Sequence, residues 1–97
     1  MDTHDLLRAE MGTTARARST FARTERLKAL VLALLAATPA GLTADEIATR
    51  LGESVLAVRP RVSELFHAGL IDKTGDRRPN ASGLGAHVWK RAAAGAP

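Results

Sequence analysis

The apolar positions of the chain first repeat with the spacing of one helix face. Between Ser19 and Ala37, large apolar residues recur at i, i+3, i+4, i+7 and i+8, and they are Leu27, Leu30, Val31, Leu34 and Leu35. This spacing predicts a helix that Pro39 and Gly41 end. Leu32 and Ala33 widen its apolar surface, so this helix is either largely buried or meets another subunit.

A shorter helix is predicted before it, over Asp2–Met11. Leu6, Leu7 and Met11 would form a small apolar patch there. Gly12-Thr-Thr14 is expected to break the helix, and the basic segment around Arg16 and Arg18 is expected to be loose.

Two helices are predicted in the middle of the chain. Thr43-Ala-Asp-Glu46 has the form of a capping box, which predicts a helix to Leu51. Gly52 suits its C-cap, and Ser54 suits the N-cap of a third helix over Val55–Ala68. The apolar face of the third helix comprises Val55, Val58, Val62, Leu65 and Phe66. Pro60 lies inside this helix and is expected to kink or tighten it.

The last third of the chain predicts a β-hairpin. One strand begins at Leu70-Ile71, a turn-rich loop follows from Thr74 to Gly83, and a second strand covers Ala86–Lys90. This loop would place Arg77 and Arg78 at the hairpin tip, and Trp89 is expected to pack on the first long helix.

The order of these elements predicts a mainly α fold with a small β-hairpin. The short turn at Gly52, with the small residue Ala48 on the preceding helix, is typical of a helix-turn-helix. The predicted fold is therefore a winged helix-turn-helix, with a three-helix core, a two-stranded wing and an extra N-terminal helical segment. We expect an N-terminal helical and basic arm over 1–18, the domain over 19–91 and a flexible tail over 92–97.

Several stretches resemble winged-helix transcription regulators of bacteria and their phages. The resemblance to MarR-like proteins lies in Leu42-Thr-Ala-Asp-Glu-Ile-Ala-Thr-Arg-Leu-Gly52, Ser54–Leu65 and Ala68-Gly-Leu-Ile-Asp72. The similarity to small phage or prophage proteins lies in Val58–Leu65, Gly75–Gly83 and Val88-Trp89. This resemblance covers about half of the chain. It implies sequence-specific binding of double-stranded DNA, with the third helix in the major groove and the hairpin on the backbone or in a minor groove.

Charge agrees with a polyanionic partner. The formal net charge is +4, and the positive charge lies toward both ends of the domain. Arg59 and Arg61 flank the core stripe of the third helix, and Ser63 faces away from it. The predicted DNA-binding residues are Ser54, Arg59, Arg61, Ser63, Lys73, Arg77, Arg78 and Asn80.

These residues also have a structural interpretation. Arg59 and Arg61 could pair with Glu53 and Glu64. Arg77 and Arg78 could belong to a solvated loop that only keeps the protein soluble. The alternatives to a transcription regulator are a winged-helix protein-interaction module, such as a phage-encoded adaptor or inhibitor of a host protein, and an accessory subunit of a DNA replication or recombination complex. A homodimer through the N-terminal helices is a further prediction.

Other functions have little support in the sequence. The chain has no cysteine, no phosphate-binding loop and no nucleophile constellation, so we expect no enzyme and no cofactor. His4, His67 and His87 lack metal-ligand spacing, although an exposed His67 could contact a phosphate. No apolar run is long enough to cross a membrane, and we expect a cytoplasmic, nucleoid-associated protein without a signal peptide.

Overall fold

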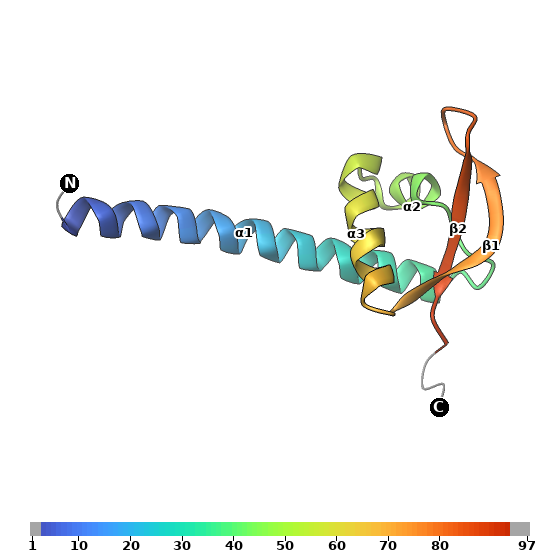
Figure 1. Ribbon diagram of the computed structural model, residues 1–97, viewed down its shortest axis with the longest axis horizontal. Coiled ribbons are helices and arrows are strands. Elements are labelled where there is room, and N and C mark those ends of the chain that lie inside the picture. Colours follow the sequence, from blue (N-terminus) through green and yellow to red (C-terminus); the bar gives the residue numbers. More distant parts are fainter. Residues whose placement is uncertain (1–2, 94–97) are drawn as a thin grey trace.

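The computed structural model describes the backbone of residues 3–93 and the side chains of residues 18–93. Its elements in chain order are α1 (Thr3–Ala36), α2 (Ala44–Leu51), α3 (Val55–His67), β1 (Ile71–Pro79) and β2 (Gly85–Arg91) (Figure 1). The chain is thus mainly α-helical with a small antiparallel hairpin, as predicted. Most of the predicted tail over 92–97 lies outside the described residues.

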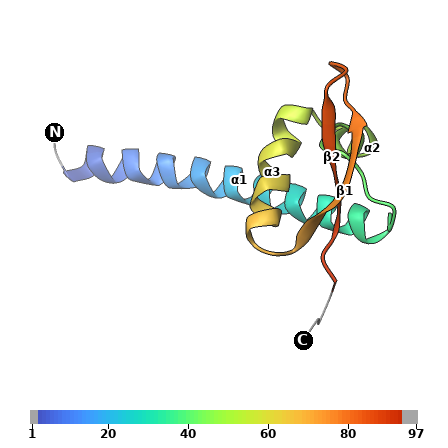
Figure 2. The ribbon, with the colours of Figure 1, turned by 45° about the vertical axis from the view of Figure 1, so that its right-hand side comes forward.

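Helix α1 is longer than the sequence pattern predicts. It runs through Gly12 and Thr14 without a break, so the predicted interruption and the predicted loose segment at Arg16 are wrong. One glycine inside a helix costs only about 1 kcal/mol relative to alanine. Strong helix formers lie at positions 9–11 and 15–18, on either side of the Gly12-Thr-Thr14 segment. The result is a single rod of 34 residues that extends well beyond the rest of the molecule (Figures 1 and 2).

The core lies between the last turns of α1 and the elements that follow it. Its buried apolar residues are Leu27, Val31, Leu35, Leu42, Ile47, Ala48, Val58, Val62, Leu65, Ile71 and Val88. The opposite side of α1 stays open, because Leu30 is 42% exposed. The part of α1 after residue 18 is therefore buried on one face only. The alternative prediction that this helix is largely buried is wrong.

The caps of α2 and α3 form as predicted. The Thr43 amide donates to Glu46 Oε1 at 2.8 Å, while the Glu46 amide donates to Thr43 Oγ1 at 3.1 Å. Gly52 closes α2 in the left-handed region at φ 67°. Ser54 Oγ accepts from the Ala57 amide at 3.2 Å and begins α3. The caps at Gly52 and Ser54 fix the turn between the two helices, and the capping box fixes the start of α2.

The hairpin differs from the prediction in the length of its first strand and in the position of its tip. Strand β1 continues to Pro79, so the tip is Asn80–Leu84, and Arg77 lies within a strand opposite His87 rather than at the tip. The register shifts between Lys73 and Arg77, so the predicted turn residues Thr74–Asp76 form an irregularity inside the strand. Neither cross-strand register nor such a bulge is encoded by local turn residues alone.

A short bridge joins the hairpin to the segment before α2. The Leu42 amide donates to the Trp89 carbonyl at 2.9 Å, and the Trp89 amide donates to the Leu42 carbonyl at 2.8 Å. Leu42 therefore acts as a one-residue third strand. None of the described helices combines the length and apolar character that a membrane span requires.

Candidate nucleic-acid interface

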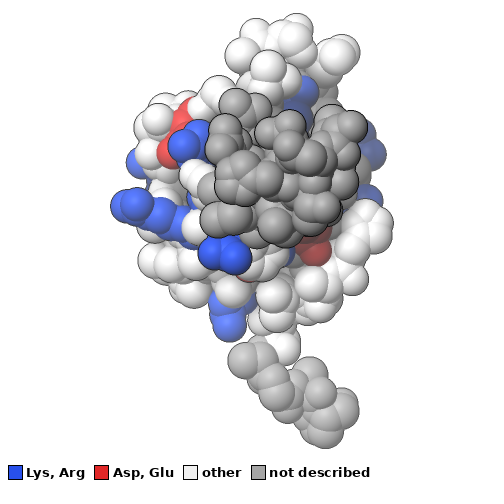
Figure 3. Space-filling view, turned by 90° about the vertical axis from the view of Figure 1, so that its left-hand side faces the viewer, with Lys and Arg blue, Asp and Glu red and all other residues white. Residues whose placement is uncertain are grey.

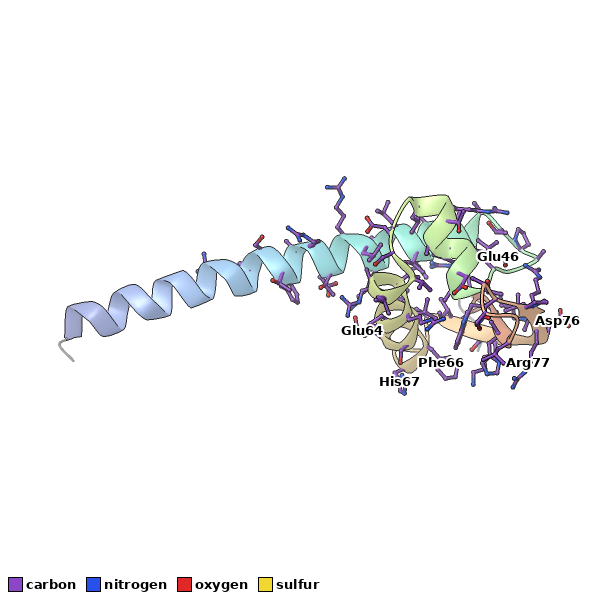
Figure 4. The ribbon with its side chains drawn as sticks, turned by 90° about the horizontal axis from the view of Figure 1, so that it is seen from above. Glu46, Glu64, Phe66, His67, Asp76 and Arg77 are labelled. Atoms are coloured by element: carbon purple, nitrogen blue, oxygen red, sulfur yellow. The ribbon has the colours of Figure 1, made fainter. Side chains whose placement is uncertain are left out.

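A groove of about 380 Å³ lies between α3 and the hairpin and is closed at one end by the start of α2. We call it the α3–hairpin groove. Its lining residues are Ala44, Asp45, Arg59, Val62, Ser63, Phe66, His67, Lys73, Ala86, His87 and Trp89. In Figure 4, Phe66 and His67 lie at the end of α3. The groove thus combines an apolar floor with several cationic or titratable groups.

The floor of the groove is aromatic. The rings of Phe66 and Trp89 meet edge to face with centroids 5.3 Å apart. Trp89 therefore contacts an aromatic ring of α3, and it also packs against the core cluster to which α1 contributes. Lys73 Nζ lies 5.2 Å from the Phe66 centroid and 5.9 Å from the Trp89 centroid. Cation–π attraction holds this ammonium group at the mouth of the groove, which limits the entropy it would lose on binding an anion.

One row of α3 faces the groove. Arg59, Ser63 and His67 are spaced four residues apart and therefore lie on one side of the helix. The Arg59 side chain is 54% exposed, and its Nη2 is 3.5 Å from Asp45 Oδ1, which is a loose and solvated pair. His67 Nδ1 donates to the Ser63 carbonyl at 2.7 Å, which leaves Nε2 available to an outside ligand.

His87 lies across the groove on β2 and has an altered titration. Partial burial lowers the pKa of His87, and the positive charges of Lys73 and Arg77 lower it further. Burial and the two cations thus disfavour the charged form of the imidazole, and the same cations would themselves attract an anion. An anion placed near Lys73 would weaken this repulsion and favour protonation of His87.

The hairpin is fastened to the first turn of α2 by two contacts. Arg78 Nη1 donates to Glu46 Oε1 at 2.7 Å, and the Ala81 amide donates to Asp45 Oδ2 at 3.2 Å. Burial raises the pKa of Glu46, but its bonds to the Thr43 amide and to Arg78 outweigh this effect and leave the pKa below its ordinary value. Arg78 therefore holds the hairpin in place rather than projecting freely.

Asn80 also has a structural role. Its Oδ1 accepts from the amides of Ser82 at 3.0 Å and Leu84 at 3.1 Å, and from the Ser82 hydroxyl. These bonds shape the hairpin tip. The side-chain oxygen of Asn80 is thus occupied by the turn itself.

Arg61 lies away from the groove, on the side of α3 that faces α1. Its Nη1 donates to Thr24 Oγ1 at 2.9 Å, and its Nη2 donates to Glu64 Oε1. Lys28 Nζ is a second cation near Glu64, at 3.8 Å. Figure 4 shows Glu64 on the α1 side of α3. Arg61 therefore ties α1 to α3, in line with the structural interpretation of its charge.

The structure brings together only part of the predicted set. Arg59, Ser63 and Lys73 line the groove, and Arg77 is exposed on the neighbouring stretch of β1. Ser54 caps the far end of α3, while Arg61, Arg78 and Asn80 are engaged within the protein. The sequence analysis missed His87 and the Phe66–Trp89 floor. Side chains alternate between the two faces of a strand, so His87 and Trp89 lie on the same face of β2. This alternation could have indicated that both residues belong to the groove.

No protein-family model matches this chain, and comparisons with curated proteins and with solved structures find no significant match. The resemblance to winged-helix regulators therefore stays a prediction.

Proposed function

We propose that this protein is a winged helix-turn-helix domain that binds double-stranded DNA. The observation that carries this proposal is the α3–hairpin groove, where Arg59, Lys73 and the imidazole of His87 surround an exposed row of α3. The order of α2, a capped turn, α3 and a hairpin agrees with a helix that enters the major groove beside a wing.

Each groove residue has a role in this proposal. Arg59 and Ser63 face base edges in the major groove, because a guanidinium pairs well with guanine and a hydroxyl accepts or donates. Lys73 and Arg77 contact phosphates as the hairpin follows the backbone. His67 uses Nε2 to reach a phosphate near the end of α3.

The biological role that fits this chemistry best is that of a bacterial or phage transcription regulator, as the sequence resemblance implies. An accessory subunit of a replication or recombination complex would use the same surface. Genome-wide mapping of bound sites separates the two, since discrete sites near promoters support the regulator and sites that follow replication forks support the subunit.

Fluorescence anisotropy on mixed-sequence duplexes over a salt series tests DNA binding. Contacts to several phosphates predict a steep loss of affinity with salt, with a slope of about 0.9 per phosphate on a log–log plot. A single strand of the same length serves as the control and should bind more weakly. Absence of binding at low salt would contradict the proposal.

A protein-interaction module is the second candidate, and one observation favours it. A groove of about 590 Å³ between α1 and α3 has exposed apolar residues at its edge, with Leu56 77% and Leu30 42% exposed. Such side chains are more typical of protein contacts than of DNA contacts. Capture of a protein partner that survives nuclease and is lost in Leu56→Glu, but not in Lys73→Ala, would support this candidate over DNA binding.

A further inference from the structure

The groove of about 590 Å³ between α1 and α3 has an apolar lining that is open to solvent, and we call it the α1–α3 groove. Leu30 of α1 and Leu56 of α3 line it and are 42% and 77% exposed. Leu27 of α1 and Leu51 at the end of α2 also line it, and they are buried and half-buried. An apolar hollow whose edges keep large side chains in water is typical of a surface that binds a partner.

The α1 side of the groove becomes cationic beyond Leu30. Arg23 and Arg26 are spaced three and four residues along the helix, so they lie on the same side of α1 as Leu30. Both arginines line the groove and are exposed. Within the side chains over 18–93, no acid forms an ion pair with either of them. Their guanidinium groups are therefore accessible to carboxylates from outside.

The other charges of the groove leave this positive side uncompensated. The lining residues include three arginines and one acid, Glu53, which precedes α3. The third arginine, Arg61, already bonds to Glu64. Figure 3, which faces this end of the molecule, shows basic side chains more prominently than acidic ones on the part that is not grey. The α1–α3 groove is thus electrostatically complementary to an acidic segment.

The elements around the groove indicate the conformation of that segment. All of its lining residues belong to the three helices or to the turn before α3, so it offers no strand edge. A partner therefore binds through its side chains and satisfies its own backbone hydrogen bonds, as a helix does. From Arg23 to Leu30 the α1 side is about 10 Å long at 1.5 Å per residue, which matches two turns of a helix.

We propose that the α1–α3 groove binds an acidic amphipathic helix of a partner protein. The apolar side of this helix lies on Leu30 and Leu56, and its carboxylates pair with Arg23 and Arg26, because a planar guanidinium matches a carboxylate with two hydrogen bonds. This inference deepens the second candidate function given above, and it does not rest on DNA binding.

Fluorescence anisotropy with synthetic peptides tests the proposal. The probe is a labelled peptide of about 15 residues with leucine along one helical face and glutamate on both sides of it. The wild type should bind this glutamate peptide at least ~10-fold more tightly than a peptide with lysine in place of every glutamate. A peptide of the same composition in scrambled order reports nonspecific binding and should also bind at least ~10-fold more weakly.

Charge reversal tests the role of the two arginines. Arg23→Glu with Arg26→Glu should weaken binding of the glutamate peptide at least ~10-fold and strengthen binding of the lysine peptide. The matched control is Lys90→Glu with Arg91→Glu, which makes the same change in charge at exposed positions of β2, outside the groove. This control should leave the preference for the glutamate peptide unchanged.

A second pair of variants tests the apolar contact. Leu56→Ser should weaken binding of the glutamate peptide at least ~10-fold, because it removes the apolar edge of the groove. Leu84→Ser is the matched control, because Leu84 is 69% exposed at the hairpin tip, and it should bind as the wild type does. Circular dichroism checks that both variants keep their fold, which two exposed positions should allow.

Several outcomes would overturn the proposal. They are equal binding of the glutamate and lysine peptides, equal effects of the two charge-reversal pairs, and no binding of the glutamate peptide at ~1 mM. A dimer in sedimentation equilibrium that Leu56→Ser dissociates would assign the groove to a second copy of the chain, and displacement of the peptide by a duplex would assign it to DNA. The duplex titration described above is a separate measurement, so DNA binding can fail while this proposal stands, and the reverse.

Discussion

Glu46 and Arg78 join the start of α2 to the hairpin through one shared carboxylate oxygen. Glu46 Oε1 accepts from Arg78 Nη1 at 2.7 Å and from the Thr43 amide at 2.8 Å. The capping box of α2 is thereby coupled to strand β1, although the two residues are far apart in sequence. This link sets the position of the hairpin relative to α3, and with it the shape of the α3–hairpin groove.

Loss of Glu46 should therefore destabilise the fold more than loss of Arg78. We expect Glu46→Ala to cost about 1–2 kcal/mol in the free energy of unfolding, since it removes half of the capping box. Arg78→Ala should cost less than about 1 kcal/mol, because both side chains of the pair are partly exposed. Urea unfolding of the two single variants and the double variant measures the coupling. Additive losses would show that the pair contributes nothing.

The same carboxylate predicts how stability depends on pH. The pKa of Glu46 in the folded protein lies below its ordinary value of 4.5. Its contribution is therefore complete above pH 4.5 and is lost as the pH falls through the lower folded pKa. Thermal unfolding between pH 7 and 3 should show a smaller decrease for Glu46→Gln than for the wild type. An identical decrease for both proteins would contradict this assignment.

Gly41 should tolerate no side chain. It has φ of +84°, and a Cβ there would lie 2.6 Å from the Trp89 carbonyl oxygen and 2.8 Å from Val88 Cγ1. We expect Gly41→Ala to cost more than about 3 kcal/mol, from left-handed strain together with separation of the Leu42–Trp89 bridge. Gly83→Ala is the control, because Gly83 has the same φ with open space around it. It should cost only about 1–2 kcal/mol by thermal or urea unfolding.

Binding of DNA should take up a proton at His87. Partial burial and the charges of Lys73 and Arg77 keep the pKa of His87 below 6.5 in the free protein, and phosphates beside these cations would raise it. Affinity for a duplex should therefore increase as the pH falls through the higher pKa of the bound state, and it should level off below the pKa of the free protein. His87→Gln should flatten this pH dependence of the affinity. In His67→Gln, the pH dependence that His87 contributes should remain. An equally steep pH dependence in His87→Gln would exclude this role.

The parts of the fold that the sequence predicts are those set by neighbours in the chain. The capping box at Thr43, the Gly52 cap and the apolar face of α3 all depend on spacings of one to eight residues. The length of β1 and the position of the hairpin tip were predicted incorrectly, because they depend on pairing with β2 and on distant contacts such as those of Trp89 with Leu42 and Phe66.

The candidate site follows the same division. Helical spacing alone places Arg59 and Ser63 on the outer row of α3. Whether an arginine is available for DNA depends instead on partners far along the chain. Arg61 meets Thr24 of α1, and Arg78 meets Glu46 of α2, and no local pattern indicates either pair.

The most direct test of the central claim compares two variants with the same change in charge. Lys73→Ala removes a cation from the α3–hairpin groove, and Arg26→Ala removes one from α1, outside that groove. Fluorescence anisotropy on one duplex over a salt series should show weaker binding for Lys73→Ala, with a salt slope smaller by about 1, and little change for Arg26→Ala. Equal losses in both variants, or no binding by the wild type at low salt, would contradict the account.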